Sequence, residues 1–287
     1  MIRIALPNKG RLAEGARELL ERAGLEVDAR ADRALQASLG EEFSAIFVNA
    51  RDIPEYVADG AADLGITGAD LVAESARSVD VLLDLGFGRC RLAVACSEDS
   101  GIGSIEDVVA GARVATVFPR LTADFFAQRG RPVAIVPVTG AVEIVPHLGV
   151  ADIIVDLVST GSTLKVNGLR EIETVMVSTA LLIGRPDLPD QPERERSIRE
   201  LLVALESVLR ARDKRYLMAN VPRRVLADVK RILPGISGPT IVDVLDGGEY
   251  VAAHAVVDQR EIYRTIADLR ALGGTGILVT RIERLMP

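Results

Sequence analysis

Apolar and polar residues alternate along the first part of the chain in two rhythms, which predict strands and helices in turn. Short apolar runs predict strands over 2–6, 43–49, 64–66 and 79–85. Apolar residues spaced three and four apart predict helices over 12–23, 53–58 and 71–76. Regular alternation of this kind is typical of a parallel sheet covered by helices. We therefore expect the first part of the chain to form an α/β lobe.

The middle of the chain repeats this pattern. It predicts strands over 91–96, 113–117, 133–136 and 151–155, and helices over 105–110, 121–128 and 141–148. A long apolar run over 175–183 predicts a strand that returns to the first lobe. We expect lobe I to comprise residues 1–90 and 178–212, and lobe II residues 91–177. Two such lobes joined by crossing strands leave a ligand cleft, as in periplasmic binding proteins, at the carboxyl ends of the strands.

The last part of the chain has a different order of elements. A turn-rich loop over 184–192 leads into an amphipathic helix over 193–212. Beyond it the pattern predicts a strand over 216–221, a helix over 223–233, a hairpin of 240–245 with 249–257 about Asp246-Gly247-Gly248, a helix over 259–272 and a strand over 277–282. This order predicts a ferredoxin-like domain over 213–287. Such an appendage is often only an oligomerisation module.

The charge and composition of the chain argue against some classes of binding partner. The net charge is −7 and aromatic residues make up 3% of the chain, with no Trp, so we expect aliphatic cores. An acidic chain without a long basic run is a poor candidate for binding nucleic acid or an anionic membrane. Its first residues predict a strand rather than a secretory segment, and no apolar run reaches about 18 residues. We expect a cytoplasmic protein whose two cysteines, Cys90 and Cys96, are reduced packing residues.

The segment that follows the predicted strand over 151–155 carries the most chemical information. Asp156 is succeeded by a loop of hydroxyl residues and glycine: Ser159, Thr160, Gly161, Ser162 and Thr163. Glycine lets backbone N–H groups approach an anion, and the start of the next helix favours negative charge. Asp156 can accept hydrogen bonds from two ribose hydroxyls. The segment predicts a 5-phosphoribosyl site, although an Asp followed by such residues is equally common as a turn with a helix cap.

Further candidates lie where other strands meet helices. Lys9 and Arg11, in the segment LPNKGRL, can hold pyrophosphate, or they are solvated charges of a turn. Arg51 begins a helix, where a cation opposes the dipole, so a ligand role is mildly favoured. Thr67, Gly68 and Asp70 form another turn, in which Asp70 more simply caps a helix.

Several common active sites lack their sequence signals. His147 and His254 are the only histidines, they are isolated in the sequence, and no Cys/His spacing indicates zinc. The chain contains no nucleophile-elbow, HExxH or P-loop motif. Hydrolase, zinc-protease and P-loop chemistry are therefore unsupported.

A longer pattern resembles the signature of the ATP phosphoribosyltransferase family. The matching positions are Glu143, Gly149, Ala151, Ile154, Asp156, Leu157, Thr160, Gly161, Thr163 and Leu164, and LPNKGRL is similar to the segment that opens these enzymes. The resemblance extends over the whole chain and is to the long form of the family. It implies transfer of the phosphoribosyl group of 5-phosphoribosyl 1-pyrophosphate to ATP, giving phosphoribosyl-ATP and pyrophosphate, the first step of histidine biosynthesis. It also gives Lys9, Arg11, Glu143 and Asp156 catalytic roles.

The same resemblance implies the remaining ligands. Arg51, Thr67, Gly68 and Asp70 would bind the nucleotide, and Mg²⁺ would be held mainly by substrate oxygens. Histidine would bind the C-terminal domain and inhibit, near the segment GISGPTI that contains Gly238 and Thr240. Asn220 stands where the family often has an acidic residue, which bears on recognition of the histidine amino group. A homo-hexamer built from dimers is implied as well.

Two other classes of protein share parts of this pattern. A solute-binding protein without catalysis would have the same two-lobed cleft, but neither the phosphoribosyl loop nor a start without a signal peptide is typical of it. A degenerate paralogue with a regulatory role would have lost part of the signature, whereas both the loop and LPNKGRL are intact.

Overall fold

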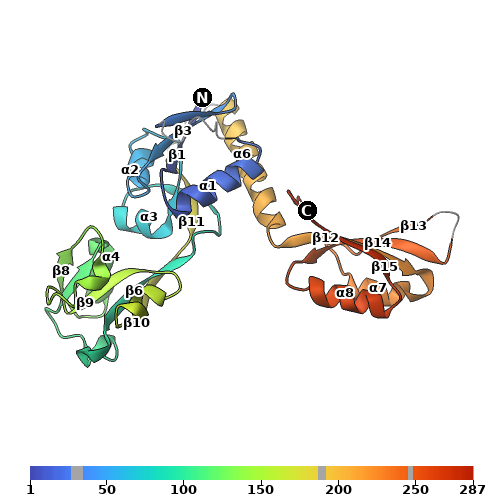
Figure 1. Cartoon of the computed structure of the whole chain (residues 1–287). Coiled ribbons are helices and arrows are strands. Elements are labelled where there is room, and N and C mark those ends of the chain that lie inside the picture. Colours follow the sequence, from blue (N-terminus) through green and yellow to red (C-terminus); the bar gives the residue numbers. More distant parts are fainter. Residues whose placement is uncertain (27–34, 187–191, 245–247, 287) are drawn as a thin grey trace. The chain divides into compact units, whose positions relative to one another are not determined.

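The computed structural model describes residues 1–26, 35–186, 192–244 and 248–286 (Figure 1). The chain divides into two compact units, one of Met1–Glu21 with Leu25–Ser197 and one of Arg22–Gly24 with Ile198–Pro287. None of the helices within these ranges is long and apolar enough to cross a membrane.

The first sheet of the larger unit has the strand order β2-β3-β1-β4-β11-β5. Its strands are β1 (Ile2–Pro7), β2 (Gln36–Leu39), β3 (Phe43–Val48), β4 (Leu64–Gly68), β5 (Asp80–Asp84) and β11 (Ala180–Gly184). Helices α1 (Arg11–Arg22), α2 (Ile53–Ala58) and α3 (Ala69–Ser75) follow β1, β3 and β4. These three strands are parallel, so the loops after their carboxyl ends gather at one edge of the sheet.

The second sheet has the order β10-β6-β9-β7-β8. Its strands are β6 (Cys90–Ser97), β7 (Arg113–Thr116), β8 (Ala134–Pro137), β9 (Ile153–Val158) and β10 (Leu169–Ser178). Helix α4 (Pro119–Gln128) contributes Phe125 and Phe126 to the core on one face. Helix α5 (Ser162–Val166) and the turn at Val142–Ile144 cover the other face through Leu164 and Val142.

Both sheets are mixed, which corrects the expected parallel arrangement. Strand β11 is antiparallel to β4 and β5, and β6 is antiparallel to both β9 and β10. The predicted single strand over 175–183 is wrong, because it covers the end of β10 and most of β11, which belong to different sheets. The run looks continuous because Val175 and Met176 pack against one core while Leu182 and Ile183 are buried in the other sheet.

Two predicted helices are also wrong. The segments 105–110 and 141–148 contain only 3₁₀ turns, at Ile105–Asp107 and Val142–Ile144. The first turn ends at Val108, whose backbone is extended with ψ 113°. The second starts from Ala141, which is in a left-handed conformation with φ 51°. Strand β2 was missed because only Leu39 among its four residues is buried.

The C-terminal unit contains a four-stranded antiparallel sheet with the order β13-β14-β12-β15, preceded by helix α6 (Pro192–Ala211). Its elements are β12 (Lys214–Pro222), α7 (Leu226–Ile232), β13 (Thr240–Asp243), β14 (Tyr250–Asp258), α8 (Ile262–Ala271) and β15 (Thr275–Arg281). Leu217, Ala219 and Val251 of the sheet pack with Val229 of α7 and Leu269 of α8. The predicted ferredoxin-like fold is confirmed. Residues 187–191 of the predicted loop and 245–247 of the hairpin lie outside the described ranges.

Candidate active site

A small cavity of about 270 Å³ lies at the loop between β9 and α5. Its lining includes the loop residues proposed from the sequence, together with Glu143, Asp156 and Arg11: Ser159, Thr160, Gly161, Ser162 and Thr163. Gly161 has φ +79°, a conformation that an L side chain rarely adopts. Helix α5 has five residues, so its dipole is small and the loop backbone is the main source of donors for an anion.

Two carboxyl groups share this cavity. Asp156 lies within β9, whose pairing with β6 continues to Val158, so its expected place at the strand end is corrected. The Leu157 N–H donates to Asp156 Oδ1 over 2.8 Å. Burial raises the pKa of Asp156, and the charge of Glu143 on the 3₁₀ turn raises it further. The two acceptors are close enough to interact, which suits recognition of neighbouring hydroxyls.

A larger cavity of about 450 Å³ lies where loops from both sheets of this unit meet. The first sheet contributes Lys9, Arg11, Arg51, Gly68 and Asp70. The second contributes apolar and hydroxyl side chains: Val117, Phe118, Leu157 and Ser159. A cavity with an apolar wall and a few convergent polar groups is typical of a small-molecule site.

Arg11 connects the two cavities. The turn before it, at Gly10 with φ +80°, places Lys9 and Arg11 at the carboxyl end of β1. Arg11 Nη1 donates to Ser159 Oγ over 3.2 Å. Arg11, Leu157 and Ser159 line both cavities, so molecules bound in the two cavities would be neighbours.

Arg51 reaches the second sheet from the loop after β3. Its Nη1 donates to the Val117 carbonyl over 2.8 Å, and its guanidinium lies 5.4 Å from the centre of the Phe118 ring. Its backbone N–H donates to Asn49 Oδ1 over 3.1 Å, which fixes the loop. The guanidinium therefore forms part of the cavity wall.

Three residues where β4 meets α3, Thr67, Gly68 and Asp70, have different structural roles. Thr67 is fully buried, does not line the cavity, and donates to the Ala50 carbonyl over 2.7 Å, thereby holding the neighbouring Arg51 loop. Asp70 is 4% exposed and accepts a hydrogen bond from the Ser178 hydroxyl, which in turn accepts from the Asp70 N–H over 3.1 Å. The residue that caps α3 is Gly68, and no side chain caps it, so the cap expected of Asp70 is absent.

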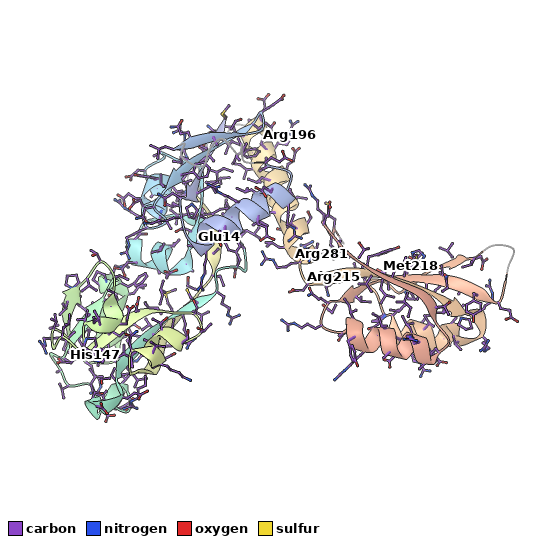
Figure 2. All side chains as sticks on the ribbon, in the orientation of Figure 1. Glu14, His147, Arg196, Arg215, Met218 and Arg281 are labelled. Atoms are coloured by element: carbon purple, nitrogen blue, oxygen red, sulfur yellow. The ribbon has the colours of Figure 1, made fainter. Side chains whose placement is uncertain are left out.

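The residues expected to bind an effector lie in the C-terminal unit. The strand register places Thr240 on β13 and Asn220 on β12 on the same sheet face as Met218 (labelled in Figure 2), away from the core formed with α7 and α8. Strand β14 separates them, so they stand roughly 10 Å or more apart. Gly238, with φ +97°, lies in the loop before β13.

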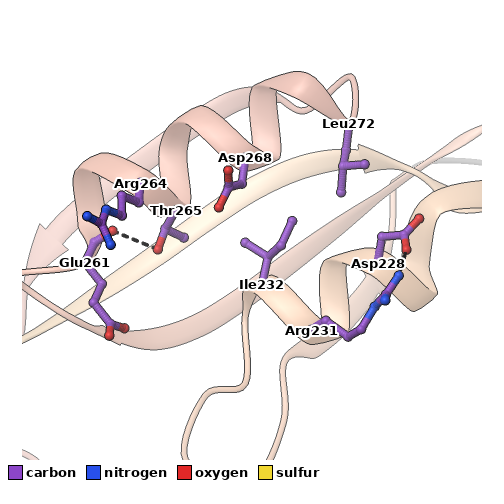
Figure 3. A pocket seen from close by; sticks show the side chains of 8 residues that line it. All are labelled: Asp228, Arg231, Ile232, Glu261, Arg264, Thr265, Asp268 and Leu272. Carbon is purple, nitrogen blue, oxygen red and sulfur yellow. Dashed lines mark hydrogen bonds and ion pairs between the residues drawn. The ribbon is translucent and has the colours of Figure 1, made fainter.

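A separate cavity of about 500 Å³ opens between α7 and α8 (Figure 3). Its rim is charged, and Arg231 is paired with Asp228. Thr265 donates to the Glu261 carbonyl over 3.0 Å. None of the residues proposed from the sequence lines this cavity.

Comparisons with known proteins identify the family of this chain. Residues 49–207 match the family model described as "ATP phosphoribosyltransferase", and residues 211–284 match that of the "HisG, C-terminal domain". The chain is 61% identical over 292 residues to the ATP phosphoribosyltransferase of Gemmatimonas aurantiaca, with all of both chains covered. It is 43% identical over 288 residues to that of Methanocaldococcus jannaschii, again with full coverage. The chain belongs to the ATP phosphoribosyltransferase family.

A solved relative gives the same result for the fold. The structure described as "ATP phosphoribosyl transferase (HisG:HisZ) complex from Thermotoga maritima" matches with a TM-score of 0.62 and 28% identity. The match covers 72% of this chain and 99% of that one. The present chain thus aligns with nearly all of that chain and has additional residues.

Several residues that line the larger cavity of the present chain were not predicted from the sequence. Phe118 is 1% exposed and Leu71 is apolar, so both resemble core residues in the sequence. Ser178 lies at the junction of β10 and β11, and the signal that was overlooked is the polar pair Ser178-Thr179 inside an apolar run. Cys90 also lines the cavity. Burial and the charge of Asp70 raise the pKa of its thiol, which is therefore protonated and a poor nucleophile.

Few protein side chains in the two cavities could bind a metal ion. Within the described ranges no three His, Cys, Asp or Glu side chains gather to form a metal site. The carboxyl groups of Asp156 and Glu143 lie in one cavity. One or two carboxylates beside substrate oxygens fit Mg²⁺, which retains much of its hydration and seldom has an all-protein cage.

Proposed function

We propose that the two adjoining cavities carry out the reaction of the family. ATP and 5-phosphoribosyl 1-pyrophosphate give phosphoribosyl-ATP and pyrophosphate, the first step of histidine biosynthesis. The observation that supports this is the shared lining of Arg11, Leu157 and Ser159, because the adenine ring and the anomeric carbon must meet between two binding sites. The smaller cavity suits the phosphoribosyl donor and the larger one suits ATP.

The donor is held by its two ends. Its 5-phosphate binds the loop of residues 159–163, whose hydroxyls and backbone N–H groups are the available donors. Asp156 accepts hydrogen bonds from the ribose hydroxyls, and Glu143 reaches the ribose or its metal. This arrangement leaves the pyrophosphate directed toward Arg11, the cation that lines both cavities.

The nucleotide occupies the larger cavity. Leu71, Phe118 and Leu157 supply apolar surface for the adenine ring, and Arg51 supplies positive charge. Gly68 leaves room for the Asp70 side chain, because a Cβ at Gly68 would overlap Asp70 Oδ1. Asp70, fixed by Ser178, is an acceptor at the cavity wall. Thr67 acts through the Ala50 carbonyl and holds the Arg51 loop in place.

The chemistry needs positioning and charge more than a base. Ring nitrogen 1 of adenine uses its lone pair to form a bond to the anomeric carbon, while the bond from that carbon to pyrophosphate breaks. The nitrogen has no proton to lose at neutral pH. Lys9 and Arg11 stabilise the negative charge that grows on the leaving oxygen, and the cavities hold the two reacting atoms together.

Mg²⁺ fits this site as a partner of the substrates. It would be held mainly by pyrophosphate and ribose oxygens, with Glu143 and Asp156 as the nearest protein carboxyl groups. When bound, it neutralises charge on the leaving pyrophosphate.

A direct assay tests the proposal. Purified protein is mixed with ATP, 5-phosphoribosyl 1-pyrophosphate and Mg²⁺, and the formation of phosphoribosyl-ATP is followed. We expect product only when both substrates are present. A protein that binds either compound but forms no product would instead support a solute-binding role for the two-lobed unit.

We also propose that the C-terminal domain, residues 213–287, is regulatory, and that histidine bound near Asn220, Gly238 and Thr240 inhibits the enzyme. The assembly is a homo-hexamer built from dimers, and the compartment is the cytoplasm. The match of residues 211–284 to a dedicated C-terminal family model and the ferredoxin-like fold support a separate functional unit. An effector bound there acts through an equilibrium between states and not through competition at the cavities.

Removing this domain should abolish histidine inhibition. A chain that ends after Arg212 is expected to keep part of its activity and to lose sensitivity to histidine, measured by titrating turnover with histidine. Because the Leu285 N–H donates to the Ser207 carbonyl of α6 over 2.9 Å, truncation also removes a contact of that helix. The substitution Thr240→Ala in the full chain avoids this and should weaken inhibition while uninhibited turnover stays the same. If the truncated enzyme remained fully sensitive to histidine, the regulatory site would lie outside residues 213–287.

The loop glycine should tolerate no side chain. A Cβ at Gly161 would have ordinary contacts, the nearest with Arg91 Nη2 at 3.8 Å, so the obstacle is the positive φ and the space claimed by the phosphate. We expect Gly161→Val to abolish donor binding, measured by calorimetry. Gly130→Val, at a comparable φ of +66° with open space around it, is the matched control for backbone strain. Normal donor affinity in Gly161→Val would show that the loop is a structural turn and does not bind the phosphate.

A further inference from the structure

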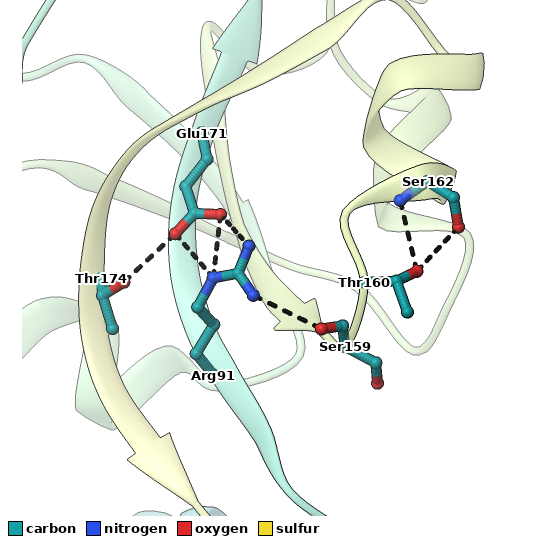
Figure 4. A network of polar contacts seen from close by, with 6 residues as sticks. All are labelled: Arg91, Ser159, Thr160, Ser162, Glu171 and Thr174. Carbon is teal, nitrogen blue, oxygen red and sulfur yellow. Dashed lines mark hydrogen bonds and ion pairs between the residues drawn. The ribbon is translucent and has the colours of Figure 1, made fainter. Parts of the chain in front are cut away.

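An ion pair lies beside the phosphoribosyl loop in the second sheet (Figure 4). Arg91 on β6 donates from Nε to both oxygens of Glu171 on β10, over 2.8 and 2.9 Å, and from Nη2 to Oε2 over 2.5 Å. The Thr174 hydroxyl donates to Glu171 Oε1 over 3.1 Å. None of these three residues was singled out by the sequence analysis, and none lines either cavity.

The pair is built to hold the guanidinium in one orientation. Several parallel hydrogen bonds between a planar guanidinium and a carboxylate restrict both groups. The side chains are only 33% and 25% exposed, and the hydrogen bond from Arg91 lowers the pKa of Glu171, which keeps the carboxyl group ionised. The charges compensate each other, so the pair adds little net attraction for an anion.

The remaining arm of Arg91 reaches the loop. Nη1 donates to the Ser159 carbonyl in a long hydrogen bond of 3.4 Å. Across a trans peptide the carbonyl and the following N–H point in opposite directions. Holding the Ser159 oxygen toward Arg91 therefore turns the Thr160 N–H away from it, and keeps a carbonyl dipole from facing a bound phosphate.

We propose that Arg91, oriented by Glu171, is a positioning residue that sets the direction of the peptide between Ser159 and Thr160 for binding of the donor phosphate. The inference rests on the proposed phosphoribosyl role of this loop. Arg91 acts through the backbone and does not itself contact the phosphate. Its loss should affect the donor much more than ATP, which occupies the other cavity.

The test measures donor and ATP binding separately. For Arg91→Ala we expect the KM and the calorimetric Kd for 5-phosphoribosyl 1-pyrophosphate to rise about tenfold or more, with the KM for ATP unchanged within twofold. Arg91→Lys should recover only part of the loss, because an ammonium cannot bind Glu171 and Ser159 in one plane. Arg113→Ala is the matched control: this arginine pairs with Asp152 over 2.9 Å in the same sheet and lines neither cavity.

Two further variants separate positioning from charge. Arg91→Ala leaves Glu171 as an unpaired carboxylate that could repel the phosphate, so Arg91→Ala/Glu171→Gln should remain impaired if orientation is what matters. Recovery of donor affinity in this double variant would overturn the proposal. Glu171→Gln alone should weaken donor binding severalfold because Arg91 is released; tighter binding would show that Arg91 is itself a phosphate ligand and would also overturn it.

Failure of the positioning role and failure of the proposed function give different results. If the unaltered protein forms phosphoribosyl-ATP and Arg91→Ala binds the donor normally, only the positioning role fails. If the unaltered protein neither binds the donor nor forms product, the proposed function of the loop fails first.

Discussion

Replacing Asp156 with alanine is expected to lower kcat/KM for the phosphoribosyl donor more than a hundredfold. Asp156 would lose two charge-assisted hydrogen bonds to ribose hydroxyls, on the order of 3 kcal/mol or more of transition-state binding. Steady-state kinetics with each substrate varied in turn measures the loss. Turnover and donor affinity close to those of the unaltered protein would remove Asp156 from the active site.

The variant Asp156→Asn distinguishes a functional carboxylate from a structural one. We expect it to lower activity while it raises stability. Burial raises the pKa of Asp156 above its ordinary value, so the folded protein binds this proton more tightly than the unfolded chain. Stability contributed by this group is present at low pH and is lost as pH rises through the folded pKa. Asp156→Asn should therefore raise Tm at pH 7 while lowering activity, and the gain in Tm should shrink on acidification. A lower Tm at pH 7 with full activity would indicate a structural carboxylate instead.

The parts of the site that were predictable from sequence are local in the chain. Ser159 to Thr163 are consecutive, so their residue types fitted a phosphate loop and a turn with a helix cap equally well. The longer family signature favoured the phosphate loop. Lys9 and Arg11 are local too, because they follow one strand, but only the family resemblance favoured a pyrophosphate role over a turn with solvated charges. Their meeting through Arg11 and Ser159 joins residues far apart in sequence, and only the resemblance to the family suggested it.

The parts that were missed depend on tertiary packing. Leu71 and Phe118 line the larger cavity, but an apolar residue in a core and one in a cavity wall have the same sequence pattern. The run over 175–183 hid a crossing between two sheets at Ser178, because burial in either core selects the same residue types. The direction of the strands could not be predicted either. The apolar content of a strand indicates that both its faces are buried, but not whether the neighbouring strands are parallel.

The Lys9 ammonium is expected to matter more to turnover than to ATP binding. Lys9 lies in the turn after β1 and lines the larger cavity with Arg11, on the side where the pyrophosphate of a donor in the smaller cavity would extend. Negative charge grows on that group only as its bond to the anomeric carbon breaks, so an interaction with it is strongest in the transition state.

We therefore expect Lys9→Met to lower kcat by roughly a hundredfold or more, the range seen for loss of one electrostatic group, with the KM for ATP changed by less than about threefold. Product inhibition by pyrophosphate should weaken in parallel, because pyrophosphate carries the charge that Lys9 meets in the transition state. Lys165→Met is the matched control, since Lys165 lies just beyond the phosphoribosyl loop but lines neither cavity. A large rise in the KM for ATP with kcat preserved would assign Lys9 to the nucleotide instead of the leaving group. In that case Arg11, which reaches both cavities, would remain as the cation positioned to stabilise the departing pyrophosphate.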